Sequence, residues 1–166
     1  MGQEGAACQL NYTNNWDDML PTYRYFFDKA PNNVRNFVDL AAGGLYDNTL
    51  FHRVIPEFVV QGGDPLTKDP KVSPELYGTG SHLDSSGRPV TVKSEPNDIP
   101  HRRGVVSMAA KASDPDSASS QFFFVLRDYP SLNGKFTVFA EVLSGMDVLD
   151  RIVQTSNSNL NDRNGG

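Results

Sequence analysis

The chain has 166 residues, 38% of them hydrophobic, which is typical of a single globular domain with one sizeable core. Its net charge is −5 and it has no cluster of four or more basic residues, which argues against nucleic-acid binding. The single cysteine, Cys8, excludes an intrachain disulfide and a cysteine-rich metal site, and the three histidines lack the spacing of zinc ligands.

The first 22 residues are atypical and contain no apolar core of a signal peptide. Nowhere does the chain approach the ~18 consecutive apolar residues of a membrane span. We therefore expect a cytoplasmic monomer, with a mature secreted form as the alternative. Within the first 22 residues, Ala7–Tyr12 is a candidate first strand, and Thr13–Leu20, around Trp16, is predicted to be an insertion.

Two segments carry apolar residues at helical spacing. The first begins after Pro31, has Asn32 or Asn33 near its start, and is predicted to stop at Gly43-Gly44. The second spans Met146–Val153. Each has one apolar stripe that must pack against another surface.

Seven short segments have the composition of β-strands. They are Tyr23–Phe27, Phe51–Ile55, Phe58–Gln61, Val90–Lys93, Val105–Met108, Gln121–Leu126 and Phe136–Val142. Short strands with two helices, without regular alternation, predict a mostly β domain whose antiparallel sheet is closed or sandwiched and capped by helices. The region from Leu66 to Arg103 is rich in Pro, Gly and polar residues, so we expect surface loop around one of these strands.

The segment FHRVIPEFVVQGGDP places an arginine and a glutamine inside an apolar strand pair. Because side chains alternate across a strand, Arg53, Val59 and Gln61 share one face. The opposite face carries His52, Val54 and Val60 and is predicted to be core. In the later strand, Gln121 and Phe123 likewise point one way, and Phe122 and Phe124 point toward the core.

The face opposite the core therefore combines apolar groups with hydrogen-bonding groups. Phe58, Val59 and Phe123 supply a small apolar pocket, and two amides and a guanidinium surround it, from Gln61, Gln121 and Arg53. This combination suits a ligand that has one apolar ring flanked by amides. A prolyl peptide fits that description.

Three stretches together, FHRVIPEFVVQGGDP, SMAAKASDPDSASSQFFFV and LNGKFTVFAEV, resemble the cyclophilin family of peptidyl-prolyl isomerases from about Tyr23 to Val153. The resemblance implies a single domain over residues 1–166 with an eight-stranded antiparallel barrel, closed or nearly closed and capped by two helices. It also implies isomerisation of X–Pro bonds in peptides and folding proteins without any cofactor.

The resemblance assigns Arg53 as the catalytic residue. It assigns the substrate-binding positions to Phe58, Val59, Gln61, Ala109, Ala110, Gln121, Phe123, Leu132 and Phe136.

A physical mechanism follows from the arginine. As the C–N bond twists against a barrier of ~18–20 kcal/mol, the prolyl nitrogen regains a lone pair, and a guanidinium near it favours the twisted state over either planar one.

Two positions depart from the family pattern. Ser131 stands where many members have tryptophan, and Phe136 stands where many have histidine. Because the indole provides a large apolar wall and an N–H donor, we expect weak binding of cyclosporin with isomerase activity retained.

The polar tail 155–166 has almost no strand character, so a final strand is not recognisable there.

Other interpretations compete with the enzymatic one. A proline-peptide-binding module with little or no turnover would need the same pocket. A hydrolase using His52 lacks a plausible nucleophile set, and the core parity of His52 favours a hydrogen-bonded buried histidine.

Single residues also have purely structural interpretations. Arg53 alone would more often be a salt-bridged structural residue, and Gln121 alone could satisfy backbone groups at a sheet end. Gly62-Gly63-Asp64 is predicted to be a turn.

Overall fold

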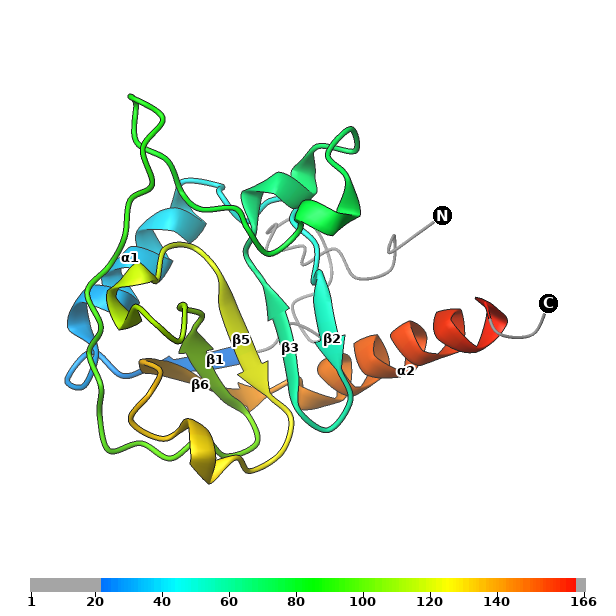
Figure 1. The fold of residues 1–166 in the computed structure, drawn as a ribbon. Coiled ribbons are helices and arrows are strands. Elements are labelled where there is room, and N and C mark those ends of the chain that lie inside the picture. Colours follow the sequence, from blue (N-terminus) through cyan, green and yellow to red (C-terminus); the bar gives the residue numbers. More distant parts are fainter. Residues whose placement is uncertain (1–21, 164–166) are drawn as a thin grey trace.

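The computed structural model describes the backbone of residues 22–163 and the side chains of residues 22–156. A six-stranded antiparallel sheet in the order β1-β6-β4-β5-β3-β2 forms the body of the protein, and two helices pack against it (Figure 1). The strands are β1 (Thr22–Tyr25), β2 (Arg53–Ile55), β3 (Val59–Gly62), β4 (Val105–Met108), β5 (Phe122–Val125) and β6 (Val138–Ser144). The helices are α1 (Pro31–Ala42) and α2 (Met146–Arg163).

The mostly β architecture with two helices agrees with the sequence, but the closed eight-stranded barrel is not confirmed. Over residues 22–163 the sheet has six strands, and its outermost strands, β1 and β2, do not pair with each other. The candidate first strand Ala7–Tyr12 and the insertion around Trp16 lie outside the described residues.

The predicted strand Val90–Lys93 is wrong. The N–H of Val90 donates to the carbonyl of His82 at 2.8 Å, whereas the N–H of Val92 donates to the carbonyl of Ala118, also at 2.8 Å. The two backbone N–H groups of the segment therefore bond to two different neighbours, and no ladder forms.

The alternation of side chains along the central strands separates two apolar clusters. Val60, Val106, Phe122 and Phe124 belong to the large cluster that includes residues of α1 and α2. Val59, Val105, Phe123 and Val125 belong to a smaller cluster. Since these residues alternate in sequence, the two clusters lie on opposite faces of the sheet. The helices cover one face, and the smaller cluster lies on the other.

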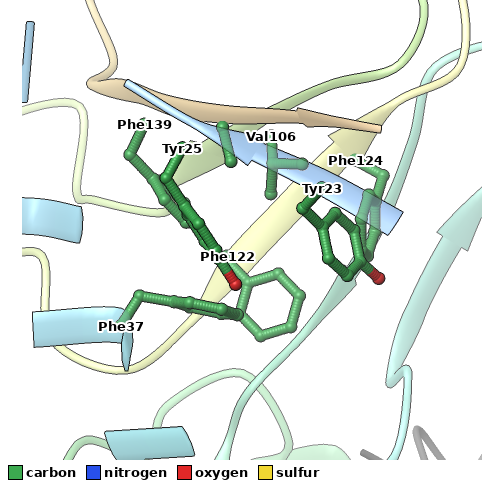
Figure 2. A pocket seen from close by; sticks show the side chains of 8 residues that line it. Tyr23, Tyr25, Phe37, Val106, Phe122, Phe124 and Phe139 are labelled. Atoms are coloured by element: carbon green, nitrogen blue, oxygen red, sulfur yellow. The ribbon is translucent and has the colours of Figure 1, made fainter. Parts of the chain in front are cut away.

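Phe37 of α1 lies at the centre of the large core. Its ring centroid is 5.0 to 5.2 Å from those of Tyr46, Phe122 and Phe139. Figure 2 shows Tyr25, Phe37 and Phe122 converging around a small cavity beside β1. The cavity has an almost entirely apolar lining and about 10 Å³ of room for a water-sized sphere, so it is a packing defect of the core.

The start of α1 is capped by a residue from a distant loop. The residue before the helix, Ala30, offers no side-chain cap, and Pro31 occupies the first helical turn. The carboxylate of Glu95 instead accepts hydrogen bonds from the backbone N–H groups of Asn32, at 3.2 Å, and Asn33, at 2.9 Å. Both asparagine side chains also donate to it. This carboxylate therefore satisfies donors that a helix leaves open and interacts favourably with the helix dipole.

We predict that Glu95→Ala lowers the free energy of unfolding by about 1–3 kcal/mol, because two helix N–H groups lose their acceptor. Urea unfolding followed by circular dichroism would measure this. The matched control is Glu75→Ala, since Glu75 is exposed in the short 3-10 turn Pro74–Leu76, and its expected effect is within about 0.5 kcal/mol. Equal effects of the two variants would contradict the capping role.

The second helix is longer than predicted. It begins at Met146 as expected but continues to Arg163, through much of the segment expected to be a polar tail. The guanidinium of Arg103 donates to both carboxylate oxygens of Asp150, at 2.9 and 2.8 Å, and attaches the helix to the body of the sheet. Neither helix within residues 22–163 combines the length and the apolar character needed to cross a bilayer.

Candidate active site

The strand register brings the predicted polar residues together. Arg53 of β2 is opposite Gln61 of β3, and Gln61 is opposite Phe123 of β5. The turn between β2 and β3 is tight, with Glu57 at φ 60°, and it preserves the parity expected from the sequence. These three side chains therefore lie in a row on the face opposite the helices.

A chain of hydrogen bonds joins the side chains of Arg53, Gln61 and Gln121, which together form the polar row of the site. Nη1 of Arg53 donates to Oε1 of Gln61 at 3.2 Å, and Nε2 of Gln61 donates to Oε1 of Gln121 at 2.9 Å. The Nε2 group of Gln121 in turn donates to the carbonyls of Gly78, at 3.0 Å, and Gly80, at 2.8 Å. Because two carbonyls hold the NH₂ group of Gln121, its oxygen must face Gln61. The orientation of both amides, and the oxygen offered to Arg53, are thereby fixed.

The loop that carries Gly78 and Gly80 is itself held by a buried aspartate. Asp64 is fully buried, and its Oδ2 accepts from the N–H of Gly78 at 2.5 Å and that of Gly80 at 3.1 Å. A Cβ on Gly80 would lie 1.9 Å from Oδ1 of Asp64, so only glycine fits. Gly63, before the aspartate, has the positive φ expected there, +84°, but the predicted turn is not formed as such, because Gly62 is the last residue of β3. The role of Asp64 as the anchor of this loop was not predicted from the sequence.

Apolar residues border the polar row. Val59 and Phe123 are buried members of the smaller cluster. Four other predicted substrate-binding residues pack against it and remain partly accessible: Phe58, Ala109, Leu132 and Phe136. The ring of Phe136 meets that of Phe123 edge-on, with centroids 5.5 Å apart. Ala110 differs, because its methyl group packs against the large core on the other face.

Arg53 is exposed and directed along this surface. Its guanidinium lies 5.8 Å from the centre of the Phe58 ring. Among residues 22–156, Arg53 forms no ion pair, so the interpretation as a salt-bridged structural residue finds no support. The positive charge remains available to a ligand beside an apolar surface.

A buried histidine lies behind the apolar residues. The ring of His101 stacks on Phe123 at a centroid distance of 6.3 Å and is 2% exposed. Its Nδ1 is 3.2 Å from Oδ1 of Asn133, and its Nε2 is 2.8 Å from the hydroxyl of Ser107. Since the amide oxygen only accepts, Nδ1 donates to Asn133 and Nε2 accepts from Ser107. This supporting group was not predicted from the sequence, because its members are separated along the chain.

His52 is half-buried, as its core parity suggested, but the predicted hydrogen bond is wrong. Within the described part of the chain, neither of its buried ring nitrogens has a hydrogen-bond partner. Burial lowers the pKa of His52, and the nearby carboxylate of Asp64 opposes that shift only in part. A neutral ring is therefore favoured near pH 7.

We expect the stability of the protein to fall as the pH drops below about 6.5. Burial lowers the pKa of both His52 and His101 in the folded state, with Asn133 partly opposing it for His101. Unfolding therefore takes up protons, and the stability present above the unfolded-state pKa is lost as the pH falls through the folded-state pKa. The slope is at most about 1.4 kcal/mol per pH unit for each histidine.

Urea unfolding at pH 7.5 and 5.5 would measure this loss above the range in which carboxylates titrate. His101→Gln should reduce the loss, whereas the exposed-site variant Ser131→Ala should leave it unchanged. A loss that is the same with and without His101 would show that this residue does not cause it.

Known proteins share sequence and fold with this chain. The family model described as cyclophilin type peptidyl-prolyl cis-trans isomerase/CLD matches residues 22–164. Peptidyl-prolyl cis-trans isomerase B of Escherichia coli is 37% identical over 150 residues, which cover 85% of this chain and 80% of that protein. Peptidyl-prolyl cis-trans isomerase-like 2 of Cryptococcus neoformans is 44% identical over 125 residues, or 75% of this chain. The matched region is only 20% of that longer relative.

A solved structure shows the same fold. A Cryptosporidium parvum cyclophilin type peptidyl-prolyl cis-trans isomerase, crystallised in the presence of the dipeptide Ala-Pro, superposes with a TM-score of 0.67 at 31% sequence identity. The superposition covers 80% of this chain and 78% of that one. The mostly β fold with two helices is therefore cyclophilin-like.

Proposed function

Because the chain belongs to the cyclophilin-type peptidyl-prolyl cis-trans isomerase family, we propose that it accelerates rotation about X–Pro bonds, with Arg53 as its catalytic residue. The observation that carries this proposal is the hydrogen-bonded row Arg53–Gln61–Gln121 beside an apolar surface on the open face of the sheet. The row provides a guanidinium and oriented amides, and the surface suits a pyrrolidine ring.

The guanidinium supplies the preference for the twisted amide. In either planar state the prolyl nitrogen shares its electron pair with the carbonyl and accepts hydrogen bonds poorly. At the transition state that pair is localised on nitrogen, and Arg53 donates to it. This interaction is stronger in the transition state than in the ground states, which is the condition for lowering a barrier.

The amides have a separate task. The carbonyls of Gly78 and Gly80 fix the orientation of the Gln121 amide. Gln121 in turn fixes the orientation of the Gln61 amide, whose oxygen accepts from Arg53. The donor is therefore oriented before the substrate arrives, and little free energy is needed to orient it during the reaction. The remaining N–H of the Gln61 amide can guide the substrate carbonyl as it turns.

The apolar residues Phe58, Phe123, Leu132 and Phe136 would hold the proline ring while the preceding carbonyl rotates. No nucleophile or general base is required. The related Cryptosporidium parvum enzyme was crystallised in the presence of Ala-Pro. By analogy we propose proline-containing peptides and folding proteins as the substrates of this chain, since X–Pro isomerisation is slow enough to limit folding. We also propose the cytoplasm as its location, with a mature secreted form as the alternative; the single cysteine fits a reducing compartment.

The direct test is NMR exchange spectroscopy on a short Ala-Pro peptide at catalytic concentrations of the protein. We expect exchange between the cis and trans signals to become measurable, although the uncatalysed step takes tens to hundreds of seconds. Chemical-shift changes on binding without any acceleration would instead support a proline-peptide-binding module.

We also predict weak binding of cyclosporin. Ser131 is exposed and small, so the turn that carries it offers no indole wall or indole N–H at that position. We expect the affinity for cyclosporin to be at least tenfold lower than in family members with the tryptophan, a difference of about 1.4 kcal/mol. Ser131→Trp should recover part of this difference. Isothermal titration would measure both. A tight stoichiometric complex with the unmodified protein would contradict the prediction.

A further inference from the structure

The turn that follows β5 contributes an aromatic residue to the edge of the site. Tyr129 packs against Phe58 with ring centroids 4.6 Å apart and planes at 63°, an edge-to-face arrangement. Tyr129 is only partly buried. Neither the strand pattern nor the resemblance singled it out, because it lies outside the strands and outside the matched motifs.

The position of Tyr129 is fixed from several directions. Its N–H donates to the carbonyl of His101 at 2.8 Å, and its carbonyl accepts from the N–H of Leu132 at 3.0 Å. Pro130 follows it and disfavours helical conformations of its backbone, which has φ −130° and ψ 80°. The tyrosine is thus held on the same 3-10 turn, Pro130–Leu132, that brings Leu132 to the apolar surface.

Two further contacts hold the Phe58 side of this pair in place. The N–H of Leu126 donates to the carbonyl of Phe58 at 2.8 Å, and Arg127 forms an ion pair with Glu57 at 2.9 Å. The β2–β3 turn is therefore attached to the segment that leads into Tyr129. Phe58 and Tyr129 together form an ordered aromatic edge, and little side-chain entropy would be lost when a ligand contacts it.

The proposed mechanism indicates which end of a bound peptide passes the aromatic edge formed by Phe58 and Tyr129. In the proposed mechanism the Gln61 amide guides the carbonyl that precedes the proline, and Gln61 is linked through Gln121 to the loop containing Gly78 and Gly80. The chain that follows the proline must then leave on the other side of Arg53, where the guanidinium lies over Phe58. On that side of Arg53, Tyr129 packs against Phe58, so the chain after the proline would pass Tyr129.

We propose that Tyr129, together with Phe58, forms a contact for the side chain immediately after the proline and favours aromatic residues there. This inference rests on the proposed isomerase function and adds a specificity-determining residue to it. The preference arises because an aromatic ring gains an edge-to-face or stacked contact with Tyr129, whereas glycine at the same position has no side chain to make one.

The experiment compares two tetrapeptides, Ala-Ala-Pro-Phe and Ala-Ala-Pro-Gly, by NMR exchange spectroscopy. For the wild type, kcat/KM with the Phe peptide should exceed that with the Gly peptide. Tyr129→Ala should lower this ratio about 3- to 10-fold and leave the rate with the Gly peptide nearly unchanged. Tyr129→Phe should keep the ratio, because the ring makes the contact. Lys135→Ala, at an exposed position just after the same turn, is the control and should also keep it.

The rate with the Gly peptide separates the two proposals. If the wild type accelerates that peptide but Tyr129→Ala leaves the ratio unchanged, or lowers both rates equally, the specificity role is overturned and the isomerase function stands. If the wild type accelerates neither peptide, the isomerase function fails and the specificity role fails with it. If Tyr129→Ala changes only the preference for the residue before the proline, measured with Ala-Phe-Pro-Gly, the proposed direction of the chain is wrong.

Discussion

Arg53→Ala is expected to lower kcat/KM for X–Pro isomerisation by at least about 100-fold, which corresponds to ~2.7 kcal/mol of transition-state stabilisation. The loss should be mainly in kcat, because Arg53 meets the prolyl nitrogen only when that atom has lost its conjugation. Arg53→Lys should also lose most of the activity. An ammonium keeps the charge but cannot donate to the amide of Gln61 and to the substrate with the same fixed geometry.

The matched control for this experiment is Arg35→Ala, which removes an exposed arginine from α1. It changes the net charge by the same amount and should leave kcat/KM within about twofold. Unfolding curves of all variants would exclude a loss of the folded state. If Arg53→Ala keeps full activity while the wild type is active, the catalytic role of the guanidinium is wrong, whatever the fate of the family assignment.

Phe37→Ala is expected to lower the free energy of unfolding by about 3–5 kcal/mol, the largest stability effect of a single core truncation that we predict. The ring is 7% exposed and makes close contacts with the rings of Tyr46, Phe122 and Phe139. Its removal would enlarge the cavity beside β1 that already exists in the core. Because whole domains are stable by only about 5–15 kcal/mol, the variant should unfold at a much lower urea concentration.

The control is Phe27→Ala, because Phe27 is 58% exposed. Its expected cost is below about 1 kcal/mol, since most of the ring is already in contact with water. Urea denaturation followed by circular dichroism would compare the two. Equal midpoints for the two variants would show that Phe37 does not organise the core.

The strand pair that carries Arg53 could be predicted from sequence because its pattern is local. The parity of Arg53, Val59 and Gln61 survives the turn, and β2 and β3 pair in the register that this parity requires. The segment Val90–Lys93 shows the limit of the same reasoning. Its composition suits a strand, but a strand also needs a neighbouring ladder, and the local pattern does not say which segments lie beside it.

The end of α2 gave no comparable signal. Residues after Val153 are rich in Asn and Ser, which are poor helix formers, yet the helix continues to Arg163. Propensity is only a weak guide to where a helix ends. The composition of this stretch does not explain its extension.

The polar row of the site could be predicted only in part. The pattern placed Gln61 and Gln121 on the correct face, but the groups that orient them are far away in sequence. Gln121 is held by a loop about 40 residues earlier, and Asp64 holds that loop. The only local signal was Gly62-Gly63-Asp64, whose glycines indicated a turn and whose aspartate was not assigned a partner.

The position of Arg53 has a consequence for how the protein responds to heating. Arg53 lies on β2, one of the two edge strands of the sheet, which has three residues and pairs with β3. Short strands at an edge separate locally at a lower cost in free energy than a whole domain unfolds. Turnover should therefore decline at temperatures where circular dichroism still reports a folded molecule, and amide protons of β2 should exchange with deuterium sooner than those of β4 and β5.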